Sequence, residues 1–293
     1  MQQPLLIDGP LVDAIHNQRA SLLRNGLMVV AFTSLEDFIR NRTVELFKII
    51  SRTVLPFSQL PKELKEAATI GAARSAVYQA GLANRAGKDP IALVQSAARS
   101  VGSTLSGALE ICEYSLAYSG PNVTSADLSS ALGAFQISDP WNEMSSIASR
   151  CGLGSLPLKQ AYETMQLNRN RAAHDVNANI QPGDFYSFVQ EAKSIAIGFD
   201  LLTSRAARLL TEGDKSVLNG KKKLSSSIAI RYIQPRGTKY VEHIENRTRA
   251  VKVAKDREEA WRLAVGNARR KRDAVVELNS RGVPIEWYTS EAP

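Results

Sequence analysis

Residues 11–52 read LVDAIHNQRASLLRNGLMVVAFTSLEDFIRNRTVELFKIISR, and this stretch determines the expected fold class. Its apolar side chains recur at steps of three and four residues, which is the spacing of one face of an α-helix. The stretch therefore predicts one long amphipathic helix, or two helices with a break at Asn25-Gly26.

Proline and glycine divide the residues that follow into further helices, because proline favours a helix start and glycine a helix end. The expected helices cover about residues 61–81, 90–118, 140–151, 157–173 and 184–210. No strand-like alternation interrupts them. Residues 1–212 are therefore predicted to form one all-α domain.

The last part of the chain has a different pattern. A polar, basic linker leads into two alternating segments, Ser226–Gln234 and Thr238–Ile244, which are separated by a turn and predict a pair of strands. A charged helix is expected over Lys255–Ser280, followed by a short apolar segment. The expected fold is mainly α, with a small α+β module of ββα(β) type at residues 213–293.

The net charge lies entirely in this C-terminal part. The chain has 37 Lys and Arg against 29 Asp and Glu, a formal charge of +8. Residues 1–212 hold 19 basic and 19 acidic side chains, whereas residues 213–293 hold 18 and 10. Basic residues interleaved with aromatic ones suit phosphate contacts and base stacking. The candidates for nucleic-acid binding are Lys221, Lys222, Lys223, Arg231, Lys239, Arg269 and Arg270.

An ordinary structural interpretation of the charged helix expected over Lys255–Ser280 remains open. In it, the charges form a solvated helix face, and Trp261, Leu263 and Val275 are core residues.

Other classes of protein find no support in the sequence. No apolar run is long enough for a membrane span, and the N-terminus lacks a secretory signal. Two cysteines are too few for a disulfide framework or a structural zinc site. Metal-protease, P-loop, dinucleotide-binding and nucleophile-elbow motifs do not occur. We expect a cytoplasmic protein without membrane association, metal or cofactor.

Among the three histidines, His174 has the most informative neighbours. It ends the segment Arg169-Asn170-Arg171-Ala172-Ala173-His174, in which an amide side chain follows an Arg placed five residues before the His. His16 and His243 are interpreted as surface or structural residues. Taken alone, the segment also permits a simple role for His174, which could cap the helix end and pair with Asp175.

The segment resembles the R-x4–6-H motif of HEPN-domain ribonucleases. Residues 19–47, with the acidic pair Glu36-Asp37, resemble the first helix of the RiboL-PSP-HEPN and MAE-type groups, and residues 184–210 resemble their closing helix. The resemblance covers about residues 15–212. It implies a HEPN-like antiparallel helical bundle and a homodimer in which two such motifs converge on one cleft.

Helix geometry limits how this motif can form a site. Five residues turn an α-helix by about 500°, which leaves His174 about 140° away from Arg169. Either His174 lies beyond the end of the helix, or the site is gathered from more than one chain.

The resemblance also implies roles for the residues. His174 would be the general acid or base, Arg169 would bind and stabilise the scissile phosphate, and Asn170 would orient His174 or a phosphate oxygen by a hydrogen bond. Arg171 and Glu36 are possible supporting residues, although Arg171 also fits a solvated position and Glu36 also fits a helix salt bridge with Arg40. The 2′-hydroxyl of RNA is the nucleophile, so this chemistry requires no metal.

The expected function is thus metal-independent RNA cleavage by a toxin or antiphage-defence effector, with RNA as substrate and an antitoxin or defence complex as a possible partner. The alternative is a non-catalytic HEPN scaffold that binds nucleic acid or a partner protein within a larger defence complex.

Overall fold

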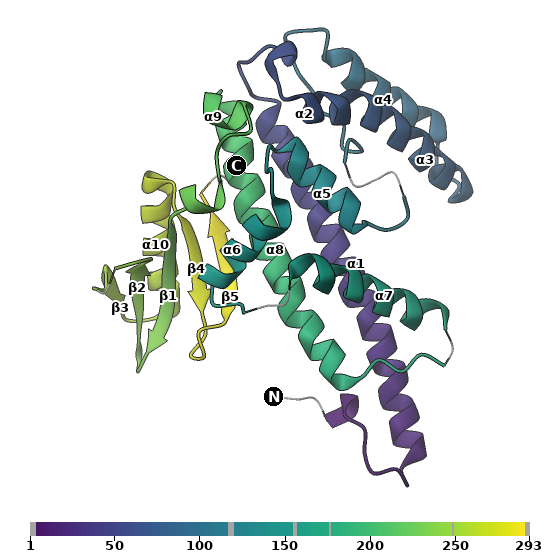
Figure 1. Ribbon diagram of the computed structural model, residues 1–293, viewed down its shortest axis with the longest axis vertical. Helices are drawn as coiled ribbons and strands as arrows, with labels where there is room; N and C mark the ends of the chain where they lie inside the picture. The colour runs from purple at the N-terminus through teal and green to yellow at the C-terminus, as the bar shows by residue number, and fades with distance from the viewer. Residues whose placement is uncertain (1–3, 117–119, 155–156, 176, 248, 291–293) are drawn as a thin grey trace.

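A single helix, α1 (Ala14–Ile50), runs along most of the molecule in the computed structural model, which describes residues 4–116, 120–154, 157–175, 177–247 and 249–290 (Figure 1). The Asp13 side chain caps its start by accepting a hydrogen bond from the His16 backbone N–H. Helix α1 does not break at Asn25-Gly26. The alternative of one long helix is therefore correct.

Helix α8 (Pro182–Thr211) packs along α1 and runs in the same direction (Figure 1). Arg24 of α1 donates to the Ile180 carbonyl just before α8, the Arg42 Nε lies 2.6 Å from Asp200, and the Thr211 hydroxyl donates to the Ile49 carbonyl. From the first contact to the third, the residue numbers increase in both helices, so α1 and α8 are parallel. The predicted antiparallel bundle is therefore wrong, because the connection between the two helices returns the chain to the first end of α1.

The connection between α1 and α8 contains several helices. Their bounds are α2 (Lys62–Glu66), a π-helical turn (Ala67–Gly71), α3 (Ala72–Arg85), α4 (Pro90–Ser103), α5 (Ser125–Ala134), α6 (Pro140–Arg150) and α7 (Leu158–His174). Helix α4 ends earlier than predicted, and residue 118, its expected end, lies outside the described residues. Helix α5 was not predicted; a capping box between Thr124 and Asp127 fixes its start.

A five-stranded mixed sheet follows the helices and the short helix α9 (Lys215–Leu218). Its strands are β1 (Ile230–Arg236), β2 (Lys239–Ile244), β3 (Lys252–Ala254), β4 (Ala274–Leu278) and β5 (Pro284–Thr289), in the order β3-β2-β1-β4-β5. Strands β1 and β4 are parallel, and the other pairs are antiparallel. The prediction of a mainly α fold is therefore wrong. The fold is a helix-rich mixed α+β fold.

Strand β4 explains part of that error, since it lies inside the region predicted as a charged helix. Helix α10 (Arg257–Lys271) ends because Arg272 adopts a left-handed backbone with φ of 62°. The next residues, Ala274–Leu278, form β4, which is buried on both faces. A strand that is buried on both faces lacks the alternation of polar and apolar residues. Its sequence therefore cannot be distinguished from that of a buried helix segment.

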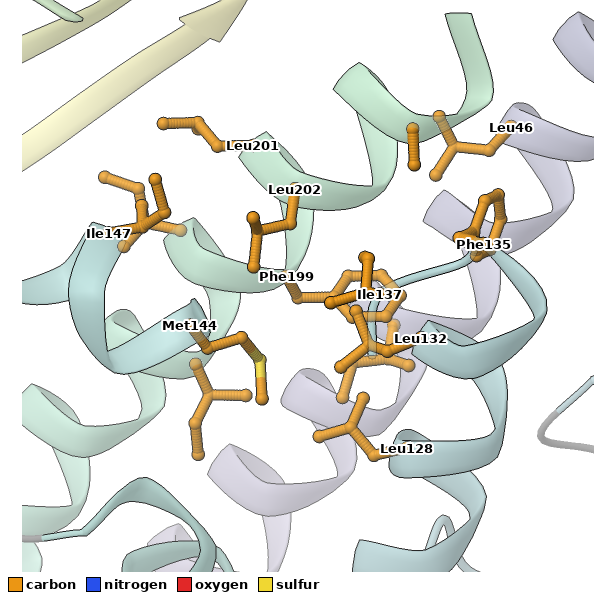
Figure 2. Packing of buried hydrophobic residues seen from close by; sticks show 14 of the residues in the cluster. Leu46, Leu128, Leu132, Phe135, Ile137, Met144, Ile147, Phe199, Leu201 and Leu202 are labelled. Carbon is orange, nitrogen blue, oxygen red and sulfur yellow. The ribbon is translucent and has the colours of Figure 1, made fainter. Parts of the chain in front are cut away.

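One hydrophobic core joins the helices to the sheet. Figure 2 shows Leu46 of α1, Leu132 of α5, Met144 of α6 and Phe199 of α8 packing together in it. Strand residues such as Val276 belong to the same core. The change of charge at residue 213 is therefore not a boundary of the core. In the described residues, no helix is both long and apolar enough to cross a membrane.

Candidate functional site

Helix α7 carries the Arg-Asn-x-x-x-His segment and is held by a buried apolar face. Tyr162 is at the centre of that face, where its ring lies 5.5 Å from the ring of Phe32 on α1 and 6.0 Å from that of Trp141 on α6. The Tyr162 hydroxyl donates a 2.7 Å hydrogen bond to the Val123 carbonyl. These contacts fix the rotation of α7, and they therefore determine where its polar residues point.

Arg169 is half-buried and retains unused hydrogen-bonding capacity. Its Nη1 lies 3.1 Å from the Asn170 side-chain oxygen. Its Nε is buried and has no hydrogen-bond partner among the described residues. A buried donor without an acceptor costs about 1–3 kcal/mol. Arg169 is thus a half-buried cation with one unsatisfied donor, and an anion oxygen would reach this Nε only after a movement of the side chain.

Glu36 lies within electrostatic range of Arg169. This α1 side chain is only 3% exposed, and its Oε1 accepts a hydrogen bond from the Val123 backbone N–H. Burial raises the pKa of Glu36 above its ordinary value of 4.5, while the Val123 hydrogen bond and the charges of Arg40 and Arg169 act in the lowering direction. The structure therefore brings Glu36 and Arg169, which are far apart in the sequence, into one charged cluster between α1 and α7.

His174 is the last residue of α7 rather than a residue beyond it. Its side chain is exposed, and no hydrogen bond or ion pair to it occurs in the part of the chain that the structure describes. The proposed pairing with Asp175 is not found: the Asp175 carboxylate instead accepts a 2.9 Å hydrogen bond from the Asn177 backbone N–H. The imidazole is thus accessible for proton exchange with a ligand or solvent.

The unbroken helix keeps Arg169 and His174 on different sides of α7. The separation of about 140° therefore applies to the folded protein. Asn170 contacts Arg169, so the structure connects it with the phosphate-binding candidate and not with His174. Arg171 is exposed. One chain alone does not bring all of the predicted site residues together.

The segment after His174 is fixed to α1 by a residue that the sequence analysis missed. Arg24 is fully buried, donates from Nε to the Ile180 carbonyl at 2.5 Å and from Nη2 to Asn179 at 2.8 Å, and pairs with Asp8 at 3.0 Å. Apolar periodicity gave no sign of this role, because an arginine on an amphipathic helix is normally assigned to its solvent face.

The basic candidates of the C-terminal part fall into three groups. Lys221, Lys223, Lys239, Arg269 and Arg270 are exposed. Lys222 is half-buried and pairs with Asp214 at 3.3 Å. Arg231 is 1% exposed and pairs with Glu242 at 2.6 Å and Asp273 at 2.7 Å. The prediction that Arg231 contacts nucleic acid is therefore wrong, since its guanidinium is enclosed beneath α10.

Folding turns most acidic side chains of this part inward. Sixteen of its eighteen basic residues are exposed, against three of its ten acidic residues, with Glu291 outside the described residues. Val275 belongs to a core cluster against which Trp261 packs, as the structural interpretation expects, whereas Leu263 is only half-buried. The surface of residues 213–290 is nevertheless strongly cationic.

Within the described ranges, no group of three or more His, Cys, Asp or Glu side chains is placed to hold a metal ion. Comparison of the chain with protein-family models, curated proteins and solved structures finds no match. The chemistry of the site is accordingly argued from its own residues.

Proposed function

We propose that this protein is a metal-independent endoribonuclease whose active site forms between two copies of the chain. The observation that supports this most directly is the arrangement on α7. Arg169, a half-buried cation with an unsatisfied donor, and His174, an exposed imidazole without a partner among the described residues, occupy different sides of one helix. A two-fold axis beside α7 would place Arg169 of one copy opposite His174 of the other.

RNA supplies the nucleophile for this reaction. His174 takes the proton of the 2′-hydroxyl, or returns one to the 5′-oxygen that leaves, because imidazole exchanges protons near neutral pH. Arg169 donates hydrogen bonds to the phosphorane oxygens, where negative charge develops. The P–O5′ bond breaks as the 2′-oxygen attacks phosphorus, and the products are a 2′,3′-cyclic phosphate and a 5′-hydroxyl.

The neighbours of Arg169 fit a supporting role. Asn170 holds one end of the guanidinium through the 3.1 Å hydrogen bond, which restricts its orientation. Glu36 offsets the positive charge of the cluster while the site is empty, because it lies buried within range of Arg169. Arg171 adds an exposed positive charge to the surface of α7, to which the RNA phosphates would be attracted.

An exposed apolar surface on α1 supports the dimer. Four large apolar side chains within about two turns of the helix face solvent: Leu22, Leu23, Leu27 and Val30. A contiguous apolar surface of this kind is typical of an interface. Helix α1 also packs against α7, so a second copy seated on this surface would lie on a helix that adjoins the candidate site. A role as a toxin or antiphage-defence effector, with an antitoxin or a defence complex as partner, is part of the same proposal.

The first test is RNA cleavage by the purified protein in EDTA. We expect His174→Ala to lower the cleavage rate by about 10²–10⁴-fold and Arg169→Ala by about 10²–10³-fold. His16→Gln and Arg74→Ala are matched controls, since His16 belongs to α1 and Arg74 to α3, and they should cleave like the parent. Cleavage that disappears in EDTA, or variants as active as the parent, would contradict the mechanism.

A mixing experiment tests whether the site is shared between chains. Arg169→Ala and His174→Ala chains are differently tagged, co-expressed and purified as the mixed dimer. If each cleft takes Arg169 from one copy and His174 from the other, one intact cleft forms and about half of the parent activity returns. A mixed dimer as inactive as either variant would show that both residues act from the same chain.

The exposed lysines favour a second candidate, a non-catalytic scaffold that binds nucleic acid or a partner protein. Such a protein would bind RNA without cutting it. Its affinity would fall when Lys221, Lys223 and Lys239 are changed to alanine and would remain unchanged in His174→Ala. The absence of cleavage separates the scaffold from a nuclease, because both would lose RNA affinity when the lysines are replaced.

A further inference from the structure

A concave site that does not include the Arg169–His174 segment lies where the helical part meets the sheet. The depression has a volume of about 510 Å³ and lies between the C-terminal end of α6 and the face of β1 and β2 that carries Tyr232 and His243. This volume falls in the range of small-molecule sites, which occur preferentially where structural units meet.

Two flat rings form part of its wall. Tyr232 of β1 and His243 of β2 are directly paired across the antiparallel strands, so their side chains stand side by side on one face. Gln234 lies two residues along β1 on the same face. The Tyr232 hydroxyl donates a 2.8 Å hydrogen bond to the Arg150 carbonyl, which holds this ring in place.

A fixed ion pair forms the wall contributed by α6. The Arg150 guanidinium pairs with Glu245 through Nε at 2.7 Å and also donates to the Ile228 carbonyl. Since Glu245 neutralises it, Arg150 contributes rigidity to the site but little net charge.

Four other polar side chains of the depression are uncommitted. Gln234, His243, Asn246 and Arg247 form no side-chain hydrogen bond or ion pair with any residue that the structure describes. Arg247 is exposed and forms no ion pair with an acidic side chain among the described residues. The site therefore combines a rigid aromatic wall with two amide groups and one guanidinium that are available to a ligand.

We propose that this depression binds a nucleoside monophosphate. The base would lie against the Tyr232 and His243 rings, where stacking accepts any flat heterocycle. Gln234 and Asn246 offer donors and acceptors to the base edge or the sugar, and Arg247 offers its planar fork to the phosphate. The ligand would touch α6, β1 and the segment after β2 together, which couples its binding to the junction between helices and sheet. This inference does not depend on the proposed nuclease activity.

The test is isothermal titration of the full-length protein with AMP, GMP, CMP and UMP, beside adenosine and inorganic phosphate. We expect at least one monophosphate to bind with a Kd below about 1 mM, and adenosine and phosphate to bind at least about tenfold more weakly. Arg247→Ala should weaken binding about tenfold. Arg249→Ala is the matched control, because Arg249 is also exposed but does not line the depression.

Further variants localise the ligand. Gln234→Ala should also weaken binding, whereas Arg169→Ala should leave it unchanged, because Arg169 lies on α7. The proposal is wrong if no monophosphate binds, if adenosine binds as tightly as AMP, or if Arg169→Ala abolishes binding while Arg247→Ala does not. None of these results depends on RNA cleavage, so the two proposals can fail separately.

Discussion

At the scale of single residues, the helical part is organised around charged side chains that are buried with partners. Arg24 satisfies its donors with two carbonyls, Asn179 and Asp8, and Arg42 joins Asp200 of α8 to Thr289 of β5. An isolated buried charge costs several kcal/mol, so such residues persist only where partners surround them. Arg169 differs from both, because its buried Nε lacks a partner among the described residues.

Glu36 gives a pH prediction at this scale. Burial raises its pKa in the folded protein above 4.5, so the folded state holds the proton more tightly than the unfolded state does. The free energy of unfolding therefore decreases as pH rises from 4.5 through the raised pKa. Glu36→Gln keeps an oxygen for the Val123 N–H and removes the buried charge. We expect this variant to be more stable than the parent at neutral pH.

The stability difference between Glu36→Gln and the parent should shrink below pH 4.5, where Glu36 of the parent is protonated in both the folded and the unfolded state. Urea unfolding at neutral pH and at a pH below 4.5 measures this difference in the free energy of unfolding. Asp37→Asn is the control, since Asp37 is exposed beside Glu36 and its replacement should change stability little. A stability difference that grows at low pH would contradict this account of Glu36.

At the scale of elements, the crossing of α6 over α8 depends on one glycine. Gly198 lies on α8 against α6, where a Cβ atom would come within 2.9 Å of the Met144 Cβ and 3.0 Å of its backbone oxygen. The short separation lets Met144 and Ile147 enter the core beside Leu202 (Figure 2). The absence of a side chain at residue 198 therefore determines how closely the two helices pack.

Gly198→Ala should destabilise the protein by about 1–3 kcal/mol, because the added methyl group forces α6 away from α8. This loss exceeds the gain of about 1 kcal/mol that alanine brings to a helix interior. Thermal or urea unfolding checks it. Gly81→Ala on α3 is the control: a Cβ atom added there would have no neighbour within 4 Å, so the substitution should be neutral or stabilising. An equal effect at the two positions would exclude close packing as the cause.

At the scale of the whole molecule, the charge distribution separates the C-terminal part from the helices, whereas the hydrophobic core joins the two. The cationic surface belongs to residues 213–290, yet the inner face of their sheet completes the core of the helices. Gly152, after α6, also approaches the β4–β5 hairpin so closely that a Cβ would lie 2.7 Å from the Gly282 carbonyl oxygen. Truncation after residue 212 would expose the core as well as remove charge, so point substitutions are the better test of the surface.

Replacing Lys221, Lys223 and Lys239 together with alanine should weaken RNA binding and reduce its salt dependence. Each lost phosphate contact on single-stranded RNA lowers the slope of log K against log salt by about 0.7, so three lost contacts lower it by about 2. Fluorescence anisotropy at several salt concentrations measures the slope. Replacing Arg74, Lys88 and Arg99 with alanine removes the same charge from the helical part of the protein and should leave the salt dependence of RNA binding unchanged. If both triple variants give the same slope, the C-terminal surface does not bind RNA.

The sequence by itself determined most of the helices, the first two strands and the position of the charge excess, but it missed α5. Apolar spacing, proline starts and the capping residues of α1 act within a few residues, so these features can be predicted locally. The Arg169–His174 segment and its spacing were also visible there. Helix geometry left two alternatives, a His174 beyond the helix end or a site gathered from more than one chain, and only the structure placed His174 within α7.

Only the tertiary structure decided which elements meet. The parallel packing of α1 and α8, the burial of β4 between β1 and β5, the enclosure of Arg231, and the approach of Glu36 to Arg169 all depend on contacts between distant parts of the chain. A local pattern fixes the hydrogen bonds within a helix or strand. It leaves open which surface covers its apolar side, because that choice depends on the packing of the whole core.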